Sequence, residues 1–161
     1  MAIRQFSKDV KVVPILSYAS GTADRVASVI DMLGYDAVFI AVHHAAIGAS
    51  ATYKVFLQHA DAASDATTLT NGADVAGTEQ TIAHTDDNKL TWFEVINPTK
   101  RFYQLNVDND TTNTTAQSAV AYLYRTRDSG PVTHATGSGT SGGSAAVLTG
   151  EVTINPSSGT K

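Results

Sequence analysis

Cysteine is absent from this chain of 161 residues. Its absence excludes a disulfide framework, a cysteine nucleophile, a thiolate zinc site and an iron–sulfur cluster. A chain without cysteine folds without oxidation, which suits a reducing cytoplasm. Stability must then come from packing and hydrogen bonds, and a chain of this length can bury enough surface to form one domain unaided.

Charged residues are also scarce. Lys, Arg, Asp and Glu make up 16% of the chain, against about 25% in an average soluble protein, and the net charge is −4. A nucleic-acid partner requires a basic surface, so we expect none. The surface is built instead from hydroxyls and small residues, because the chain contains 21 Thr, 13 Ser and 12 Gly.

Long apolar runs are missing as well. The longest, residues 37–42, has the length of a strand and is far shorter than the roughly 18 residues of a membrane helix. The N-terminus does not resemble a secretory signal, because its apolar run at residues 12–16 is short and contains Pro14. We therefore expect no membrane partner and a protein made in the cytoplasm.

The chain does contain a series of short β-like segments, rich in Val, Ile, Tyr and Phe and separated by turn residues. They lie at residues 37–42, 53–58, 91–96, 101–107 and 119–125. The first is apolar throughout, so both of its faces should be covered, as in a central strand. Residues 22–33 fit either a helix or an extended segment ending at Gly34, and we favour the extended form.

Alternation along these segments predicts which side chains share a face of a sheet. Residues 53, 55 and 57 form one such set, residues 103, 105 and 107 a second, and residues 120, 122 and 124 a third. The sequence therefore predicts an all-β fold: a single-domain antiparallel β-sandwich or jelly-roll-like barrel with flexible terminal arms.

The composition divides the chain into three parts. Residues 1–16 are an N-terminal arm or first strand, residues 17–131 the β-sandwich domain, and residues 132–161 a Gly/Ser-rich linker and C-terminal arm. Sheet edges with so little charge need a cover, which the arms or another subunit can supply. The arms therefore hold the predicted contact residues, which are Ile3, Arg4, Phe6, Val147, Leu148, Val152 and Ile154. Whether these pack on their own domain or between subunits stays open.

No catalytic or metal-binding pattern accompanies the strands. His43 and His44 are adjacent in an extended segment and must point to opposite faces, so they cannot hold one metal together. The acidic pairs fit turns better than calcium loops, and a nucleophile elbow is missing. We therefore expect no enzyme, no metal and no cofactor. Trp92, Tyr122 and Tyr124 leave a carbohydrate-binding module as an alternative if they are exposed.

A series of turn and strand segments resembles a known family. It begins with Ser17-Tyr18-Ala19-Ser20-Gly21-Thr22-Ala23, continues through residues 29–38, 64–69 and 77–78, and ends with Lys100-Arg101-Phe102-Tyr103-Gln104-Leu105-Asn106-Val107-Asp108. This order resembles the small structural proteins of tailed bacteriophages, which include capsid cement proteins, also called decoration or head-stabilisation proteins. The resemblance covers residues 12–127 approximately.

The resemblance implies a non-enzymatic virion protein that binds the outside of the capsid and stabilises it. Its partners would be the major capsid protein and copies of itself, as a homo-oligomer such as a dimer or a trimer. It would be made in the host cytoplasm and located on the capsid surface. The alternative within this class is a tail, neck or head-fibre component.

Overall fold

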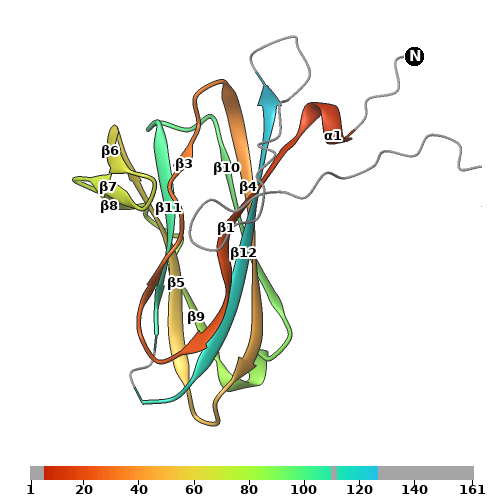
Figure 1. Cartoon of the computed structure of the whole chain (residues 1–161), viewed down its shortest axis with the longest axis vertical. Coiled ribbons are helices and arrows are strands. Elements are labelled where there is room, and N and C mark those ends of the chain that lie inside the picture. The colour runs from red at the N-terminus through yellow and green to blue at the C-terminus, as the bar shows by residue number, and fades with distance from the viewer. Residues whose placement is uncertain (1–5, 110–111, 127–161) are drawn as a thin grey trace, which may run out of the picture.

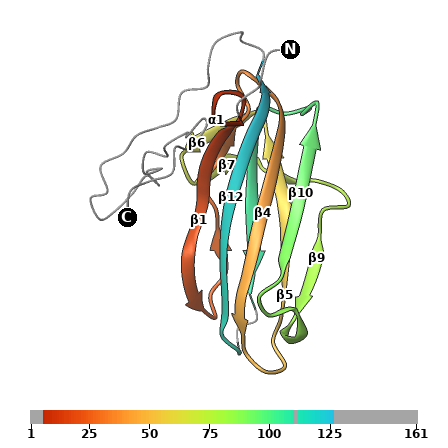
Figure 2. The same cartoon turned by 90° about the vertical axis from the view of Figure 1, so that its right-hand side faces the viewer.

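In the computed structural model, which describes residues 6–109 and 112–126, the chain folds into two antiparallel sheets that lie face to face (Figure 1). The first, sheet A, has β12 (Thr115–Thr126) and β4 (Tyr35–Ile47) at its centre. Its two edges are β1 (Lys11–Gly21), beside β12, and β10 (Leu90–Ile96), beside β4 (Figure 2).

The second sheet, sheet B, is built around β11 (Phe102–Asp108) and β5 (Thr52–Ala60). The outer edge of β11 pairs with β2 (Arg25–Val26) and β3 (Ile30–Asp31), and that of β5 with β8 (Ala73–Asp74) and β9 (Gln80–Ala83). The elements outside the two sheets are α1 (Phe6–Asp9), the hairpin of β6 (Ala62–Asp65) and β7 (Thr68–Thr70), and a short 3-10 helix (His84–Asp86).

The connectivity of the two sheets is that of a jelly roll. Since β2 and β3 share one position in sheet B and β8 and β9 share another, the sandwich has eight strand positions. Numbered along the chain, these positions run 1-8-3-6 across sheet A and 2-7-4-5 across sheet B. Two interlocked Greek keys of this kind define the jelly roll. The predicted all-β sandwich is therefore confirmed, and its topology is specified.

The core lies between the sheets and follows the predicted alternation. The inward side chains of β5 and β11 are almost wholly buried: Tyr53, Val55, Leu57, Tyr103, Leu105 and Val107. They pack against the inner face of sheet A, which is formed mainly by Val38, Ile40, Val42, Ala119, Ala121 and Leu123. Burial of this apolar surface, at about 25 cal/mol per Å², is the main force that holds the two layers together.

One expectation about the strand at residues 37–42 is wrong. Its inner side chains are buried as expected, but Phe39 and Ala41 on its outer face are only half-buried. The reason is that β4 is central within its sheet but lies in a two-layer sandwich, where one face of each sheet meets solvent. A continuous apolar run therefore marks a strand whose outer face is apolar without being fully covered.

Pro14 does not interrupt the first strand. β1 lies at the edge of sheet A, where one side of the strand pairs with no strand among the described residues. A missing N–H is tolerated there, and the register shifts between Pro14 and Leu16. The strand continues to Gly21, so the limit we drew at residue 16 falls inside a strand of the sandwich.

Residues 22–33 are extended, as we favoured, and contribute β2 and β3. Gly34 then turns the chain towards β4 with a φ of 87°, a value that side chains disfavour. Residues 60–77, which lie between the predicted strand segments at 53–58 and 91–96, contain the β6–β7 hairpin and β8. Asn71, in the turn between β7 and β8, has a φ of 53°. Of the described residues, none forms a helix long and apolar enough to cross a membrane.

Candidate functional site

The outer face of sheet A is the most unusual surface of the molecule. Residues paired directly across antiparallel strands share a face, so the register identifies its members. Tyr122 lies beside Phe39, Val120 beside Ala41, and Trp92 on the other side of Ala41. The whole set comprises Val12, Pro14, Ala37, Phe39, Ala41, His43, Leu90, Trp92, Glu94, Ile96, Ser118, Val120, Tyr122 and Tyr124. This set contains no Lys or Arg and a single carboxylate.

Three large apolar side chains of β10 protrude from this face. Leu90 is 65% exposed, Trp92 is 60% exposed and Ile96 is 52% exposed. A single exposed apolar residue is ordinary on a protein surface, whereas a contiguous group is characteristic of an interaction site. We call these three residues the β10 strip.

The strip lies on an unprotected sheet edge. β10 pairs with β4 on one side, and on its other side it pairs with no strand of the described ranges. Native edge strands are usually protected by Lys, Pro or a bulge, and β10 contains none of these within Leu90–Ile96. Both the side chains and the free backbone groups of β10 are therefore available to a partner.

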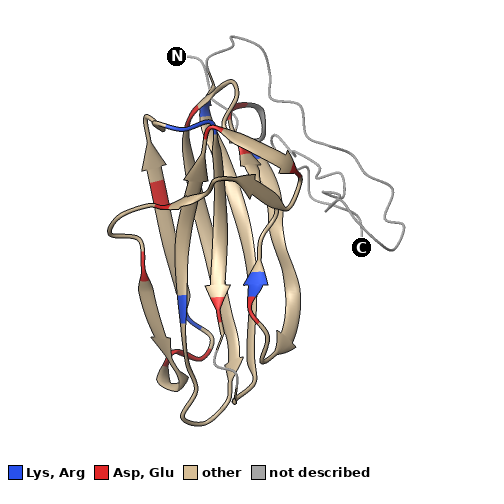
Figure 3. Cartoon of the chain, turned by 90° about the vertical axis from the view of Figure 1, so that its left-hand side faces the viewer, with Lys and Arg blue, Asp and Glu red and all other residues tan. Residues whose placement is uncertain are grey.

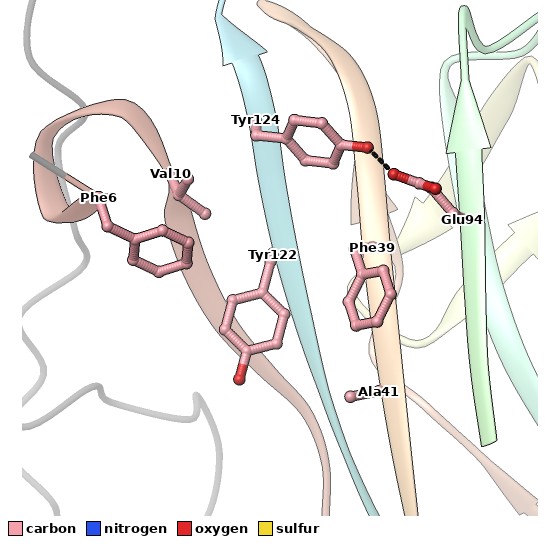
Figure 4. Close-up of a pocket in the computed structure, with 7 residues that line it drawn as sticks. All are labelled: Phe6, Val10, Phe39, Ala41, Glu94, Tyr122 and Tyr124. Carbon is pink, nitrogen blue, oxygen red and sulfur yellow. Dashed lines mark hydrogen bonds between the residues drawn. The ribbon is translucent and has the colours of Figure 1, made fainter. Parts of the chain in front are cut away.

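A groove with a volume of about 680 Å³ lies on the same face, next to α1 (Figure 4). Its walls come from α1, from Val10 between α1 and β1, and from β12, β4 and β10. The lining residues are Phe6, Val10, Phe39, Ala41, Glu94, Tyr122 and Tyr124. The groove is thus mostly aromatic and aliphatic, as ligand and peptide sites commonly are.

Aromatic contacts hold the groove and the strip in one continuous surface. The rings of Phe39 and Trp92 stack with their centroids 5.7 Å apart and their planes 18° from parallel. Tyr122 packs at an angle against Phe39 on one side and Phe6 on the other, with centroids 6.2 Å apart in both pairs. Contacts of this geometry favour fixed ring positions, so the surface is already formed before any partner binds.

Two polar groups of the groove, the Tyr124 hydroxyl and the Glu94 carboxylate, form a hydrogen bond with each other. The Tyr124 hydroxyl donates a hydrogen bond to the Glu94 carboxylate across β4 (Figure 4). Burial, and then this carboxylate, raise the pKa of Tyr124 to about 12, so the tyrosine keeps its proton at neutral pH. The one charge on this face therefore has a hydrogen-bond partner within the face.

A separate polar cluster lies inside the sandwich, between the two sheets. His44 is 1% exposed, and its Nδ1 lies 2.5 Å from the Tyr53 hydroxyl of sheet B while its Nε2 lies 2.8 Å from Thr91 Oγ1. Burial lowers the pKa of His44 to about 4 and raises that of Tyr53, so both groups are neutral at pH 7. The hydrogen bond between His44 and Tyr53 links the two sheets. Because His44 is enclosed between them, its side chain is not accessible to a substrate.

Arg25 joins the sheets through a second network, which adjoins this cluster at Gln117, the residue paired with His44 across β12 and β4. Its guanidinium donates hydrogen bonds to the Ser17 carbonyl at 2.6 Å and to the Gln117 carbonyl at 2.9 Å. Gln117 in turn donates to Thr115 Oγ1 at 2.6 Å and to Asn109 Oδ1 at 2.9 Å. The sequence contained no local signal for this network, because its members lie far apart along the chain.

Among the predicted contact residues, only Phe6 lies within the described ranges. It is 63% exposed on α1 and lines the groove, so the structure places it on the candidate surface. Ile3, Arg4, Val147, Leu148, Val152 and Ile154 lie outside the described residues.

The histidines of the described residues are not gathered into a metal site. His43 is exposed on the outer face of sheet A and His44 is buried on the inner face, which confirms that these neighbours point apart. Within the described ranges, no group of three or more His, Cys, Asp or Glu side chains could hold a metal ion.

The aromatic residues divide as alternation required. Phe93 is a core residue with 7% of its surface exposed, and Trp92 points outward. What sequence reasoning missed is the role of β4, whose outward Phe39 and Ala41 form the floor between the groove and the strip. The signal was present in the apolar run at 37–42, which we interpreted as burial on both faces.

Comparisons with known proteins add little. No family model matches the chain, and no curated protein matches it. One similar solved structure is titled "Bacillus endospore appendages form a novel family of disulfide-linked pili". It has a TM-score of 0.40 and 11% sequence identity, and the match covers 77% of this chain and 96% of that one. A likeness of this strength says nothing about function.

Proposed function

We propose that this protein is a non-enzymatic virion structural protein that binds the outside of a phage capsid and stabilises it, in the manner of a cement or decoration protein. Its partners are the major capsid protein and copies of itself. The observation that carries the proposal is the β10 strip, an apolar group of Leu90, Trp92 and Ile96 on an unprotected edge.

The nature of the partner follows from the chemistry of that surface. A face without Lys or Arg does not attract nucleic acid or anionic lipid. It suits a protein surface of matching shape, and a free edge strand can extend a neighbouring sheet. Many copies on a repeating shell gain strength by multivalency, so each contact can be small. The resemblance of the segments within residues 12–127 to phage head proteins favours a capsid as that shell.

Binding to heads assembled from the major capsid protein of the source phage tests the proposal by co-sedimentation. The double variant Leu90→Asp with Ile96→Asp should weaken binding more than tenfold, because it places two charges in the interface. Val26→Asp is the matched control: Val26 is 50% exposed on sheet B, so this variant should bind like the wild type.

Electron cryo-microscopy of the source virions provides the direct measurement. Density for this chain on the shell is the expected result. Absence of the chain from the head, or its presence in isolated tails, would contradict the proposal.

A carbohydrate-binding module is the second candidate, favoured by the 60% exposure of Trp92 beside the tyrosines of the groove. An exposed indole can stack on a sugar ring. Binding on a glycan array that Trp92→Ala abolishes would establish this function. Wild-type protein that binds no glycan on the array excludes it.

A further inference from the structure

We propose that the groove beside α1 is a docking site for the C-terminal segment of the same chain, residues 146–154. This inference goes beyond the proposed function, because it concerns the isolated protein and does not depend on which shell the protein binds. The β10 strip adjoins the groove on the same face, but none of its three residues lines the groove, so a segment lying in the groove leaves the strip accessible to a capsid.

The point where the described chain ends is the first argument. β12 ends at Thr126, and the same strand places Tyr122 and Tyr124 in the groove four and two residues earlier. Figures 1 and 2 show this end of β12 close to α1, whose Phe6 forms the opposite wall. A chain of 35 further residues, 127–161, therefore starts beside the groove.

The length of the intervening chain is the second argument. Residues 127–145 span up to about 60 Å when fully extended, and as a Gly/Ser-rich linker they have a root-mean-square span of about 24 Å. Both spans are ample for a return to a groove that begins beside Thr126. A tethered segment then faces its site at an effective concentration on the order of 1 mM, so a modest affinity is sufficient.

The chemistry of the segment is the third argument. Residues 129–150 contain no Lys, Arg, Asp or Glu, and residues 146–154 hold two pairs of large aliphatic side chains, Val147 with Leu148 and Val152 with Ile154. The groove is apolar, and its one carboxylate, Glu94, is bonded to Tyr124. The two aliphatic pairs fit such a groove, whereas Glu151, the one charged residue of the segment, must stay in solvent because it would lose its hydration in the groove without gaining a partner.

The absence of cysteine makes a direct test possible, since two introduced cysteines are the only thiols in the full-length chain. Val12→Cys lies on the outer face beside Tyr122, and it is combined with Leu148→Cys. Disulfide formation is followed in a glutathione buffer, which gives the effective concentration of one thiol at the other. The control pair combines Val26→Cys on sheet B with the same Leu148→Cys.

We expect the first pair to form an intramolecular disulfide with an effective concentration at least about tenfold above that of the control pair. Adding Val147→Asp, or Tyr122→Lys on the groove side, should lower the first value towards the control. Thr133→Asp in the linker should not change it. Circular dichroism verifies that each variant keeps its β structure.

Two results would overturn the proposal. Equal effective concentrations for both pairs, unaffected by Val147→Asp, would mean that the segment does not dock. Disulfide-linked dimers in place of monomers would assign the groove to the segment of a neighbouring copy. Neither result bears on capsid binding through the β10 strip, because the measurement uses the isolated protein.

Discussion

The outer faces of the two sheets are opposites, although both belong to one sandwich. On sheet B the exposed groups pair with each other: Lys54 with Glu79 at 2.9 Å, Gln58 with Asp74 at 2.9 Å, and Arg101 with Asp31 through two hydrogen bonds. Figure 3, viewed from this side, shows acidic and basic positions on the strands and their loops. The outer face of sheet A has one comparable pair, Tyr124 with Glu94.

Sheet B also provides a cover for itself. The side-chain amide of Gln104, on its outer face, donates to the carbonyls of Ala27 and Thr67 at 2.8 and 2.7 Å. These bonds attach the β6–β7 turn and the chain between β2 and β3 to the sheet. Among the described residues, sheet A has only α1 at one end of its outer face. The outer face of sheet B is therefore partly covered by segments of its own chain, whereas most of the outer face of sheet A has no cover among the described residues.

The largest loss of stability is expected when the hydrogen bonds that attach the covering segments to sheet B are removed. Gln104→Ala deletes both hydrogen bonds and leaves the buried Ala27 carbonyl without its donor. We expect a loss of about 2–3 kcal/mol in the free energy of unfolding, measured by urea denaturation. Gln58→Ala, which removes one exposed bond on the same sheet, should cost less than about 0.5 kcal/mol. Equal losses for the two variants would refute the distinction between covered and exposed parts of this face.

Between pH 7.5 and pH 5, acid should lower the stability of the protein through His44, which lies between the sheets, and not through groups on either outer face. The folded pKa of His44 is about 4, below its ordinary value of 6.5, so the unfolded chain takes up the proton first as the pH falls. The stability contributed by neutral His44 is complete above pH 6.5 and decreases towards pH 4. We expect a loss of about 2 kcal/mol between pH 7.5 and pH 5.

Urea denaturation at several pH values measures this loss. His44→Gln should flatten the pH dependence in that interval, and His43→Gln on the outer face should preserve it. A free energy of unfolding that stays constant between pH 7.5 and pH 5 in the wild-type protein would contradict the prediction.

The smallest effect on stability is expected where the two outer faces are compared directly. Leu90→Asp on sheet A and Val26→Asp on sheet B each replace an exposed side chain, so each should change the free energy of unfolding by less than about 0.5 kcal/mol. Thermal unfolding provides the measurement. A loss of more than 2 kcal/mol for Leu90→Asp alone would mean that the apolar face serves folding and not binding.

Local patterns predicted the strands of the sandwich well and their arrangement only in part. Alternation grouped Tyr53 with Leu57, and Tyr103 with Leu105, on shared faces that the structure buries, because the period of a strand is a local property. It could not place Arg25, whose bonds to Ser17 and Gln117 depend on which strands become neighbours. The β6–β7 hairpin was missed because its two strands are short and β6 consists mainly of Ala and Asp, which are depleted in strands.

The candidate site was predicted from the sequence in fragments. The shared face of residues 120, 122 and 124, the opposite faces of Trp92 and Phe93, and a contact role for Phe6 were all available from alternation and composition. Their union into one surface required the register of β12, β4 and β10. The sequence shows that residues 37–42 form an apolar strand, but only the two-layer architecture shows that half of its side chains face outward.

The position of β12 has a consequence for how the protein acquires its structure. β12 is the last strand of the chain, yet it lies between β1, the first, and β4. During synthesis the edges of β1 and β4 must therefore wait, unpaired, until almost all of the domain has been made. Such non-local pairing is slow, and waiting edges are prone to join those of other nascent chains. Yield in the cell should therefore depend more on temperature and chaperone supply than the stability of the finished sandwich suggests.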